Sequence, residues 1–268
     1  MNDITTQNQS AQPSTLAPDA GLATSYEQAK MYPRDMKQSL SRALQELELV
    51  PELAEKSYYS IPYKEGGGRH MVEGLSIKAS MVLARWWGNI ATDARVVSED
   101  KSNFYVRGAC IDLETNFPNA TEVRVSKYYK PKNSQGVVPW PSDMMRNQVL
   151  SGMSKAKRNA VLQIIPEYIK DAYFQRAKEL VINPIKRDNR PIESLQVRIM
   201  NGKNAISQKF GIKGAELDEY MEEVCDGLDE GSFFANLTGI FNALKEGSLK
   251  ADDIRKGKRA PFMPQEKK

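Results

Sequence analysis

Three consecutive glycines lie between basic side chains in the stretch KEGGGRHMVEG, residues 64–74. The backbone amides of glycine-rich loops hold phosphate groups in many nucleotide-binding proteins. A Walker A loop, however, needs GxxxxGK followed by Ser or Thr, and a dinucleotide-binding loop needs GxGxxG between a strand and a helix. The stretch fits neither pattern, which argues against an ATP site. We interpret it as a turn that leads into a helix, at the rim of a binding groove or at a subunit contact, or as a loop whose Arg69 and His70 contact a nucleic-acid backbone.

The stretch MMRNQVLSGMSKAKRNAVLQII, residues 144–165, contains no Asp or Glu. At helical spacing one side is apolar, from Met145 to Ile164, while the opposite side carries only basic, amide and hydroxyl groups. A solvated helix face usually mixes acids with bases, because pairs four residues apart stabilise it. A face made only of donors suits phosphate oxygens, so we expect it to bind a polyanion, with a merely solvated face as the alternative. Its side chains are Asn147, Gln148, Ser151, Lys155 and Arg158, flanked by Arg146 and Lys157.

Residue types that carry catalysis are sparse. The chain has a single histidine and two cysteines, Cys110 and Cys225, without metal-ligand spacing, so neither a zinc site nor a histidine-based triad is expected. A metal-dependent nuclease needs clustered carboxylates, whereas the acids between Asp100 and Asp143 are scattered. The sequence therefore predicts a binding protein that uses no metal or cofactor, and not an enzyme.

Aromatic residues accompany several of the central cations. Two tryptophans at 86–87 follow Arg85, two tyrosines at 128–129 follow Lys127, and Trp140 precedes the basic helix. Aromatic rings stack on the bases of single-stranded nucleic acids. The alternative for each ring is a place in the hydrophobic core, where most aromatic side chains lie.

Charge is unevenly distributed along the 268 residues, although the net charge is only +4. Residues 127–190 carry 13 Lys and Arg against 5 Asp and Glu, whereas residues 213–246 carry 2 against 9. A basic middle and an acidic later segment suggest two modules with different partners. No apolar run is long enough to span a membrane, and the N-terminus lacks the pattern of a secretory signal, so we expect a cytoplasmic protein.

Hydrophobic periodicity predicts both helices and strands. Amphipathic helices are expected at 33–48, 74–89, 142–165 and 167–181. Ser142 is the expected N-cap of the third helix. Alternating runs separated by short polar turns predict an antiparallel β-meander of three strands, at 94–98, 103–114 and 121–129. The expected fold class is α+β, with the meander packed on helices and a small helical bundle at the C-terminal end.

Composition divides the chain into five segments. The N-terminal residues are rich in Ser, Thr, Gln and Pro, the stretch NPIKRDNRP is polar and charged, and the C-terminal residues are basic. The expected organisation is a disordered tail at 1–24, a core at 25–182, a linker at 183–191, a helical module at 192–250 and a basic disordered tail at 251–268.

Two stretches carry a family resemblance. The sequences ARVVSEDKSNFYVRGACIDLET and SKAKRNAVLQIIP, together with the order of the elements around them, resemble the single-strand annealing proteins of phage recombination. These are the RecT and Redβ group, the Erf-type proteins and, more distantly, the Rad-fifty-two annealing fold. The similarity covers roughly residues 55–182, and the acidic helical module after residue 192 is similar to the C-terminal modules of such proteins.

The resemblance implies a core that anneals single-stranded DNA without ATP and assembles into rings or helical filaments. By position, Lys155, Lys157 and Arg158 would contact phosphates, with Arg146 and Gln148 beside them. Some relatives continue the basic helix for another turn or two with further cations, whereas here Ile164, Ile165 and Pro166 end it. The candidates that would replace those cations are Lys78, Arg85, Arg69 and Lys127.

The resemblance also implies partners. These are single-stranded DNA, the annealed duplex intermediate and, through residues 192–250, a partner exonuclease or single-strand binding protein. Two alternatives from other classes stand beside the annealing function. One is a DNA-processing nuclease; the other is a structural or regulatory phage protein that binds RNA or duplex DNA. A duplex reader needs a recognition helix, but the helix after QKFGIKG is acidic and would repel DNA.

Overall fold

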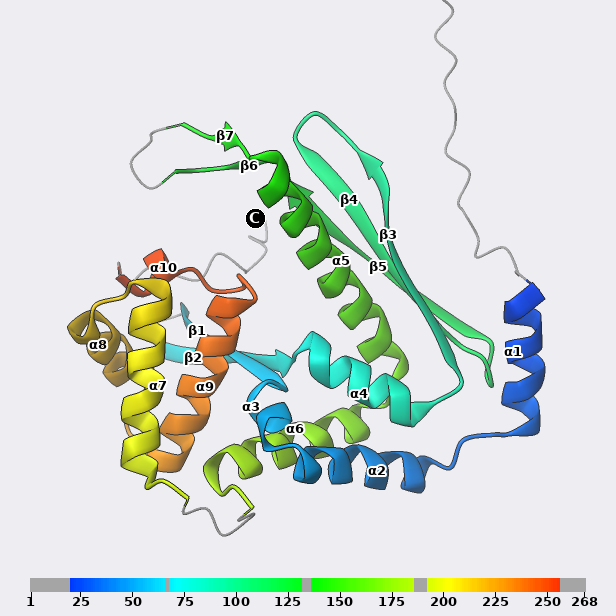
Figure 1. The fold of residues 1–268 in the computed structure, drawn as a ribbon, viewed down its shortest axis with the longest axis horizontal. Helices are drawn as coiled ribbons and strands as arrows, with labels where there is room; N and C mark the ends of the chain where they lie inside the picture. Colours follow the sequence, from blue (N-terminus) through cyan, green and yellow to red (C-terminus); the bar gives the residue numbers. More distant parts are fainter. Residues whose placement is uncertain (1–19, 66–67, 132–135, 186–191, 256–268) are drawn as a thin grey trace, which may run out of the picture.

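The structure is a computed structural model of the chain, and it describes residues 20–65, 68–131, 136–185 and 192–255. It is an α+β fold, with small antiparallel sheets packed against helices, which confirms the predicted fold class. Figure 1 shows the sheet of three strands with a long helix, α5, on one side of a central gap, and the C-terminal helices on the other. Among the described residues no helix is long and apolar enough to cross a membrane.

The predicted meander is the main sheet. Its strands pair in the order β3-β4-β5, all antiparallel, and a short two-stranded ribbon, β6 and β7, continues from its end. The observed strands are offset from the predicted ones by a few residues because apolar side chains define only the buried part of each strand. The bounds are Ile90–Glu99 for β3, Asn103–Asp112 for β4, Phe117–Ser126 for β5, Tyr128–Tyr129 for β6 and Val138–Pro139 for β7.

The basic helix α5, Ser142–Ile164, packs on this sheet at backbone distance. A Cβ atom at Gly108 of β4 would lie 2.2 Å from the carbonyl of Ala156, and one at Gly152 would lie 2.3 Å from Val125. The hydroxyl of Thr121 donates to the carbonyl oxygen of Ala156 at 2.9 Å. The small side chains therefore decide which side of α5 faces the sheet.

Four further helices lie around the sheet and α5. The linker before α2 is attached to the sheet by Arg34, which pairs with Asp112 at 2.7 Å and Glu114 at 2.9 Å and lies 4.5 Å above the ring of Trp87. Two predicted helices, α2 and α4, pack on each other, and Ser76 is the N-cap of α4. The bounds are Met36–Leu49 for α2, Pro51–Glu55 for α3, Ile77–Trp87 for α4 and Glu167–Ile182 for α6.

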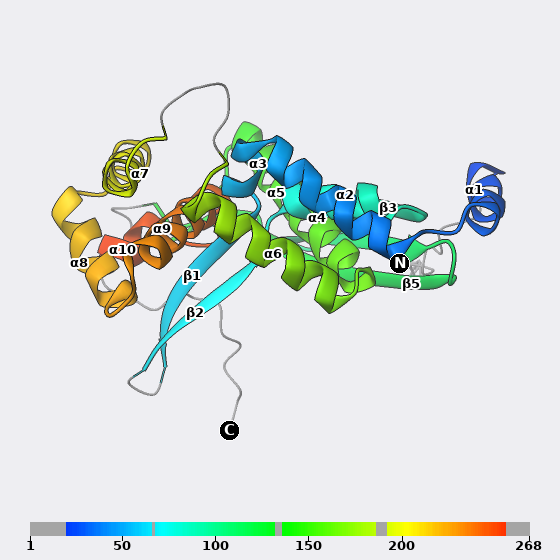
Figure 2. The same ribbon diagram turned by 90° about the horizontal axis from the view of Figure 1, so that it is seen from below.

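The glycine-rich stretch belongs to a β-hairpin and not to a turn that enters a helix. Strands β1, Tyr58–Glu65, and β2, Gly68–Leu75, pair antiparallel with Glu65 opposite Gly68. Residues 66–67 lie outside the described residues. Figure 2 shows the hairpin projecting from the body of the molecule. The sequence did not show the second strand, because its polar and apolar side chains do not alternate cleanly.

The C-terminal helices share one hydrophobic core with the hairpin, with α2, α4 and α6, and with the end of α5. Helix α9 lies against β1 so closely that a Cβ atom at Gly239 would be 2.3 Å from the hydroxyl oxygen of Ser60. The hydroxyl of Tyr58 donates to the carbonyl oxygen of Ala235, and the amide of Asn242 donates to the carbonyl oxygen of Tyr58. The bounds are Leu195–Phe210 for α7, Gly214–Cys225 for α8, Glu230–Lys245 for α9 and Ala251–Arg255 for α10.

Three local predictions differ from the structure. Residues 20–24, which were expected in a tail, begin the helix α1, Ala20–Met31; Ala29 of this helix packs against Ile111 and Leu113. Residues 251–255, also expected in a tail, form α10, while 1–19, 256–268 and the linker residues 186–191 lie outside the described residues. The N-cap of α5 is Pro141 and not Ser142. The missed helices are short, so tertiary contacts and not local pattern stabilise them.

We expect Gly108→Ala to destabilise the protein by about 1–3 kcal/mol or more, because the added methyl group meets the backbone of α5, which cannot rotate away. Chemical denaturation measures this loss. Gly214→Ala is the matched control, since a Cβ atom there would meet nothing within 4 Å. Equal stability of the two variants would show that α5 is less closely packed on β4.

Candidate nucleic-acid interface

Two of the predicted cations on α5 face the C-terminal helices. Arg158 is only 9% exposed, and its guanidinium lies 3.3 Å from the carboxylate of Glu246, just after α9, and 5.1 Å from the ring of Tyr59. Lys155 lies one turn earlier on the same side of the helix. Partial burial lowers the pKa of Lys155, and repulsion from Arg158 lowers it further, while the carboxylate of Glu246 acts in the opposite direction.

Glu246 is an acid surrounded by cations. Burial raises its pKa, and the neighbouring charges of Arg158, Lys155 and Lys245 only partly oppose that increase. The carboxylate therefore compensates three cations at once but is itself poorly solvated.

Lys245 connects this group to three more lysines. Partial burial lowers its pKa, and repulsion from Lys209, Lys78 and Lys56 lowers it further. Lys56 and Lys245 also line one groove, and the charges of Lys78 and Lys209 act on Lys245. The four lysines therefore form one electrostatic group. They come from the ends of four different elements: Lys56 follows α3, Lys78 is in the first turn of α4, and Lys209 and Lys245 are in the last turns of α7 and α9.

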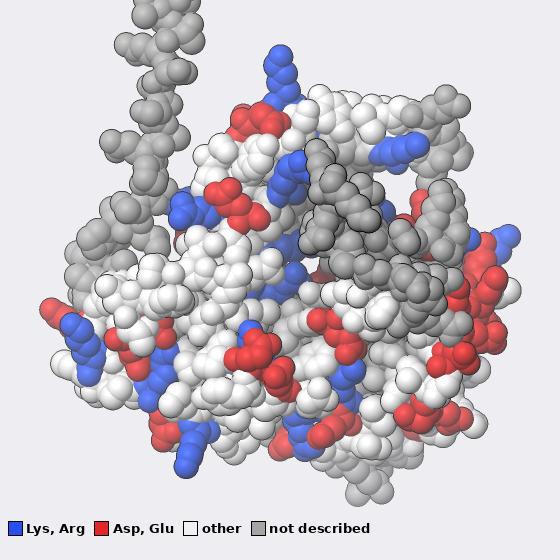
Figure 3. Space-filling view, turned by 180° about the vertical axis from the view of Figure 1, so that it is seen from behind, with Lys and Arg blue, Asp and Glu red and all other residues white. Residues whose placement is uncertain are grey.

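The five lysines and the arginine described in this region form a group that we name the basic cluster. Four of them, Lys56, Lys78, Lys155 and Lys245, make no ion pair with any residue that the structure describes, and Lys209 lies over the rings of Phe210 and Phe241. On the face opposite to Figure 1, Lys and Arg side chains are seen in a central hollow, whereas acidic side chains gather along the edge at α8 (Figure 3). The members are Lys56, Lys78, Lys155, Arg158, Lys209 and Lys245.

The other predicted site residues lie elsewhere. Arg85 pairs with Glu46 of α2 at 3.0 Å, and Lys127 pairs with Glu99 at 2.8 Å at the end of the sheet. Lys157 lies on the sheet side of α5, where its charge reaches Cys110. The structure thus brings together three of the nine predicted residues, Lys78, Lys155 and Arg158.

Three predicted residues remain. Arg146 and Gln148 lie in the first half of α5, exposed and half-buried. The side chain of Arg69 is outside the described part of the chain.

The predicted aromatic residues serve mainly as structural contacts. Trp87 is 6% exposed beneath Arg34, and the indole nitrogen of Trp86 donates to Glu46. The rings of Tyr129 and Trp140 stack on each other at 4.3 Å, which holds the ribbon of β6 and β7 to the start of α5.

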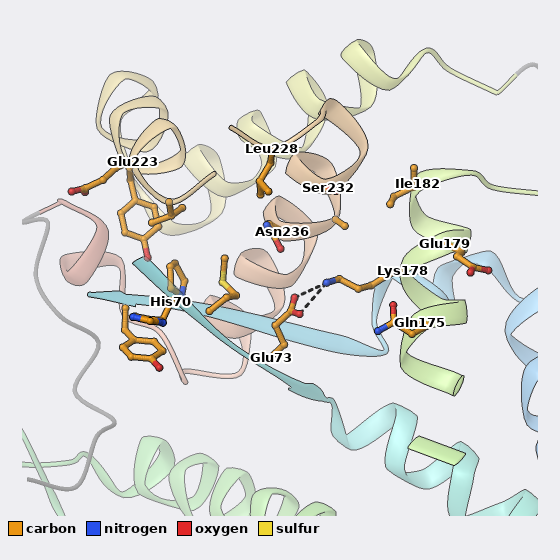
Figure 4. Close-up of a pocket in the computed structure, with 16 residues that line it drawn as sticks. His70, Glu73, Gln175, Lys178, Glu179, Ile182, Glu223, Leu228, Ser232 and Asn236 are labelled. Carbon is orange, nitrogen blue, oxygen red and sulfur yellow. Dashed lines mark hydrogen bonds and ion pairs between the residues drawn. The ribbon is translucent and has the colours of Figure 1, made fainter. Parts of the chain in front are cut away.

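A separate cavity of about 470 Å³ lies between the hairpin strands β1 and β2 and the helices α6, α8 and α9 (Figure 4). His70, the only histidine, lines it and stacks on Tyr63 at 5.3 Å, and Lys178 pairs with Glu73 at 2.8 Å. Two more acids, Glu179 and Glu223, line the same cavity, so it does not favour a polyanion. His70 therefore lines an acidic cavity and lies apart from the basic cluster.

The three lysines and the acid that sequence reasoning missed are Lys56, Lys209, Lys245 and Glu246. A single lysine in the last turn of a helix has an ordinary explanation, since a cation there interacts favourably with the helix dipole. The only feature that these four residues share is that each lies at or directly after the end of a helix.

Comparison of the chain with protein-family models, with curated proteins and with solved structures gave no match. Among the described residues no group of three or more His, Cys, Asp or Glu side chains could hold a metal ion.

We expect Glu246→Gln to change how stability depends on pH. Burial raises the pKa of Glu246, so the folded protein holds this proton more tightly than the unfolded chain does. That contribution is full below the unfolded pKa and is lost as the pH rises through the raised folded pKa. The free energy of unfolding of the variant, relative to the wild type, should therefore increase between about pH 4 and about pH 8.

Urea denaturation at several pH values tests this expectation, with the exposed acid Glu222, changed to Gln, as the control. A relative stability of Glu246→Gln that decreases with pH would mean that the three cations outweigh the cost of burial.

Proposed function

We propose that the protein binds single-stranded DNA and anneals complementary strands without ATP, as a phage-type recombination protein. The observation that carries the proposal is the basic cluster. Arg158 pairs with a single acid, Glu246, on which Lys155 and Lys245 also act, and three more lysines act on Lys245. Like charges at close range destabilise a folded protein, and a polyanion in contact with them relieves that cost.

The cluster suits a phosphate backbone better than a small anion. Its members lie in α4, α5, α7 and α9 and directly after α3, so they offer several contact points to an extended ligand. Each phosphate that a lysine or arginine neutralises releases condensed counterions, which supplies affinity without sequence preference. An annealing protein needs that kind of contact, because the bases must stay free to pair.

The resemblance to the RecT, Redβ and Erf-type proteins supports the same function and adds a setting for it. We expect the protein to act in the bacterial cytoplasm as a homo-oligomer, a ring or a helical filament, and to use no cofactor. The acidic side chains of α8 are the surface that we propose for docking an exonuclease or a single-strand binding protein.

The direct test is the annealing of two complementary oligonucleotides without nucleotide or metal, followed by fluorescence quenching at two salt concentrations. We expect the protein to accelerate annealing and the acceleration to fade as the salt concentration rises. Metal-dependent shortening of the DNA would indicate a nuclease instead. Binding of RNA or duplex DNA without annealing would favour the structural or regulatory alternative.

We expect the double variant Lys155→Gln with Lys245→Gln to bind all single strands more weakly. The slope of log affinity against log salt concentration should fall by about 1.4, because each lost contact with a single strand removes about 0.7. Fluorescence anisotropy at several salt concentrations measures both effects. The matched control is Lys30→Gln with Lys101→Gln, two exposed lysines outside the basic cluster.

Arg158 is left unchanged in this experiment, because its loss would leave Glu246 half-buried without its ion pair. An unchanged salt slope in the double variant would remove the basic cluster from the DNA-binding surface.

A further inference from the structure

A groove of about 350 Å³ between α7 and α9 opens beside the basic cluster. Lys56 and Lys245 line the groove and are also members of the cluster, so the two features are continuous. The volume falls within the range of about 300–1,000 Å³ that is usual for small-molecule sites. A single strand of DNA that crosses the basic cluster would therefore pass the mouth of a groove large enough for one of its bases.

The groove is lined by aromatic and polar side chains. The rings of Phe234 and Phe241 belong to it, and Phe241 packs edge-on against Phe210 with 5.8 Å between the ring centroids. The polar residues Asn201 and Thr238 also line the groove, as does Asn242, whose side-chain amide already donates to the carbonyl oxygens of Glu55 and Tyr58. Flat apolar surface together with amide and hydroxyl groups is what a nucleobase requires, since its faces are apolar and its edges carry donors and acceptors.

The charges in the groove are arranged unequally. Two acids, Glu55 and Glu193, line it, but both act on Arg198, whose guanidinium lies 4.5 Å above the ring of Phe234. Lys56 and Lys245 make no ion pair with any described residue. The end of the groove at these two lysines is therefore the end that favours a phosphate.

We propose that the groove between α7 and α9 receives the base of one nucleotide of the bound single strand, while Lys56 and Lys245 hold the adjacent phosphates. This inference rests on the proposed function and gives it a specific anchor. A base that is paired within a duplex cannot enter the groove, so the site distinguishes an unpaired strand from an annealed one. It also gives the C-terminal helices a part in DNA binding, besides any docking role.

The experiment uses fluorescence anisotropy to compare the binding of two DNA strands to the wild type and to three variants. The strands are a thymidine oligonucleotide and an abasic strand of the same length. Ala205→Trp fills the groove from an exposed position on α7 without changing a charge. Asn201→Trp does the same from a second exposed position. Ala215→Trp, exposed on α8, is the control.

We expect the wild type to bind the thymidine strand about tenfold more tightly than the abasic strand, in line with the contribution of about 1–3 kcal/mol per stacked base. Both groove variants should bind the thymidine strand about tenfold more weakly. Their affinity for the abasic strand should be unchanged, and the Ala215 variant should match the wild type.

Two results would overturn the inference while leaving the proposed function intact. One is equal wild-type affinity for the two strands; the other is an equal loss for both strands in the groove variants. If the wild type binds neither strand, the proposed function is wrong, and the nucleotide site is wrong with it.

Discussion

The close contact between α5 and the sheet is the constraint on which the rest of the structure depends. Gly108 and Gly152 let the helix approach to backbone distance, and this depth fixes the rotation of α5 about its axis. With the small side chains against the sheet, Lys155 and Arg158 must face the C-terminal helices. The positions of these two cations are thus a consequence of how the neighbouring small residues Gly152 and Ala156 pack on the sheet.

The second organising feature is electrostatic. Docking of α9 on β1 brings the last turns of α7 and α9 towards α5, which gathers cations that repel one another around a single acid. A protein selected for stability alone would place more acids there. Under the proposed function, the excess of positive charge exchanges stability for the ability to hold a polyanion.

The pattern of apolar and polar residues along the sequence was sufficient to predict the fold class, the meander and most helices. Its periodicity is clear in this chain, and the turns between the strands are short. It was insufficient for contacts between distant segments. Arg158 looked like part of an exposed basic face, but it pairs with Glu246, 88 residues away. Lys209 and Lys245 lie in the helical module at 192–250, whose net charge is negative, so the composition of that module gave no indication of a basic site. The net charge of a segment describes only that segment, whereas the basic cluster is made from residues in or directly after several helices that are far apart in the sequence.

The hydrogen bond from Tyr58 to Ala235 joins residues 177 positions apart, and it has a consequence for the order of events during protein synthesis. The hairpin and α5 leave the ribosome long before α9 exists, and contacts of such long range form late in folding. A nascent chain therefore has its sheet and its basic helix but lacks Lys209, Lys245 and the groove between α7 and α9. We expect only the completed chain to possess the full basic cluster, so that, under the proposed function, unfinished polypeptides would not occupy DNA.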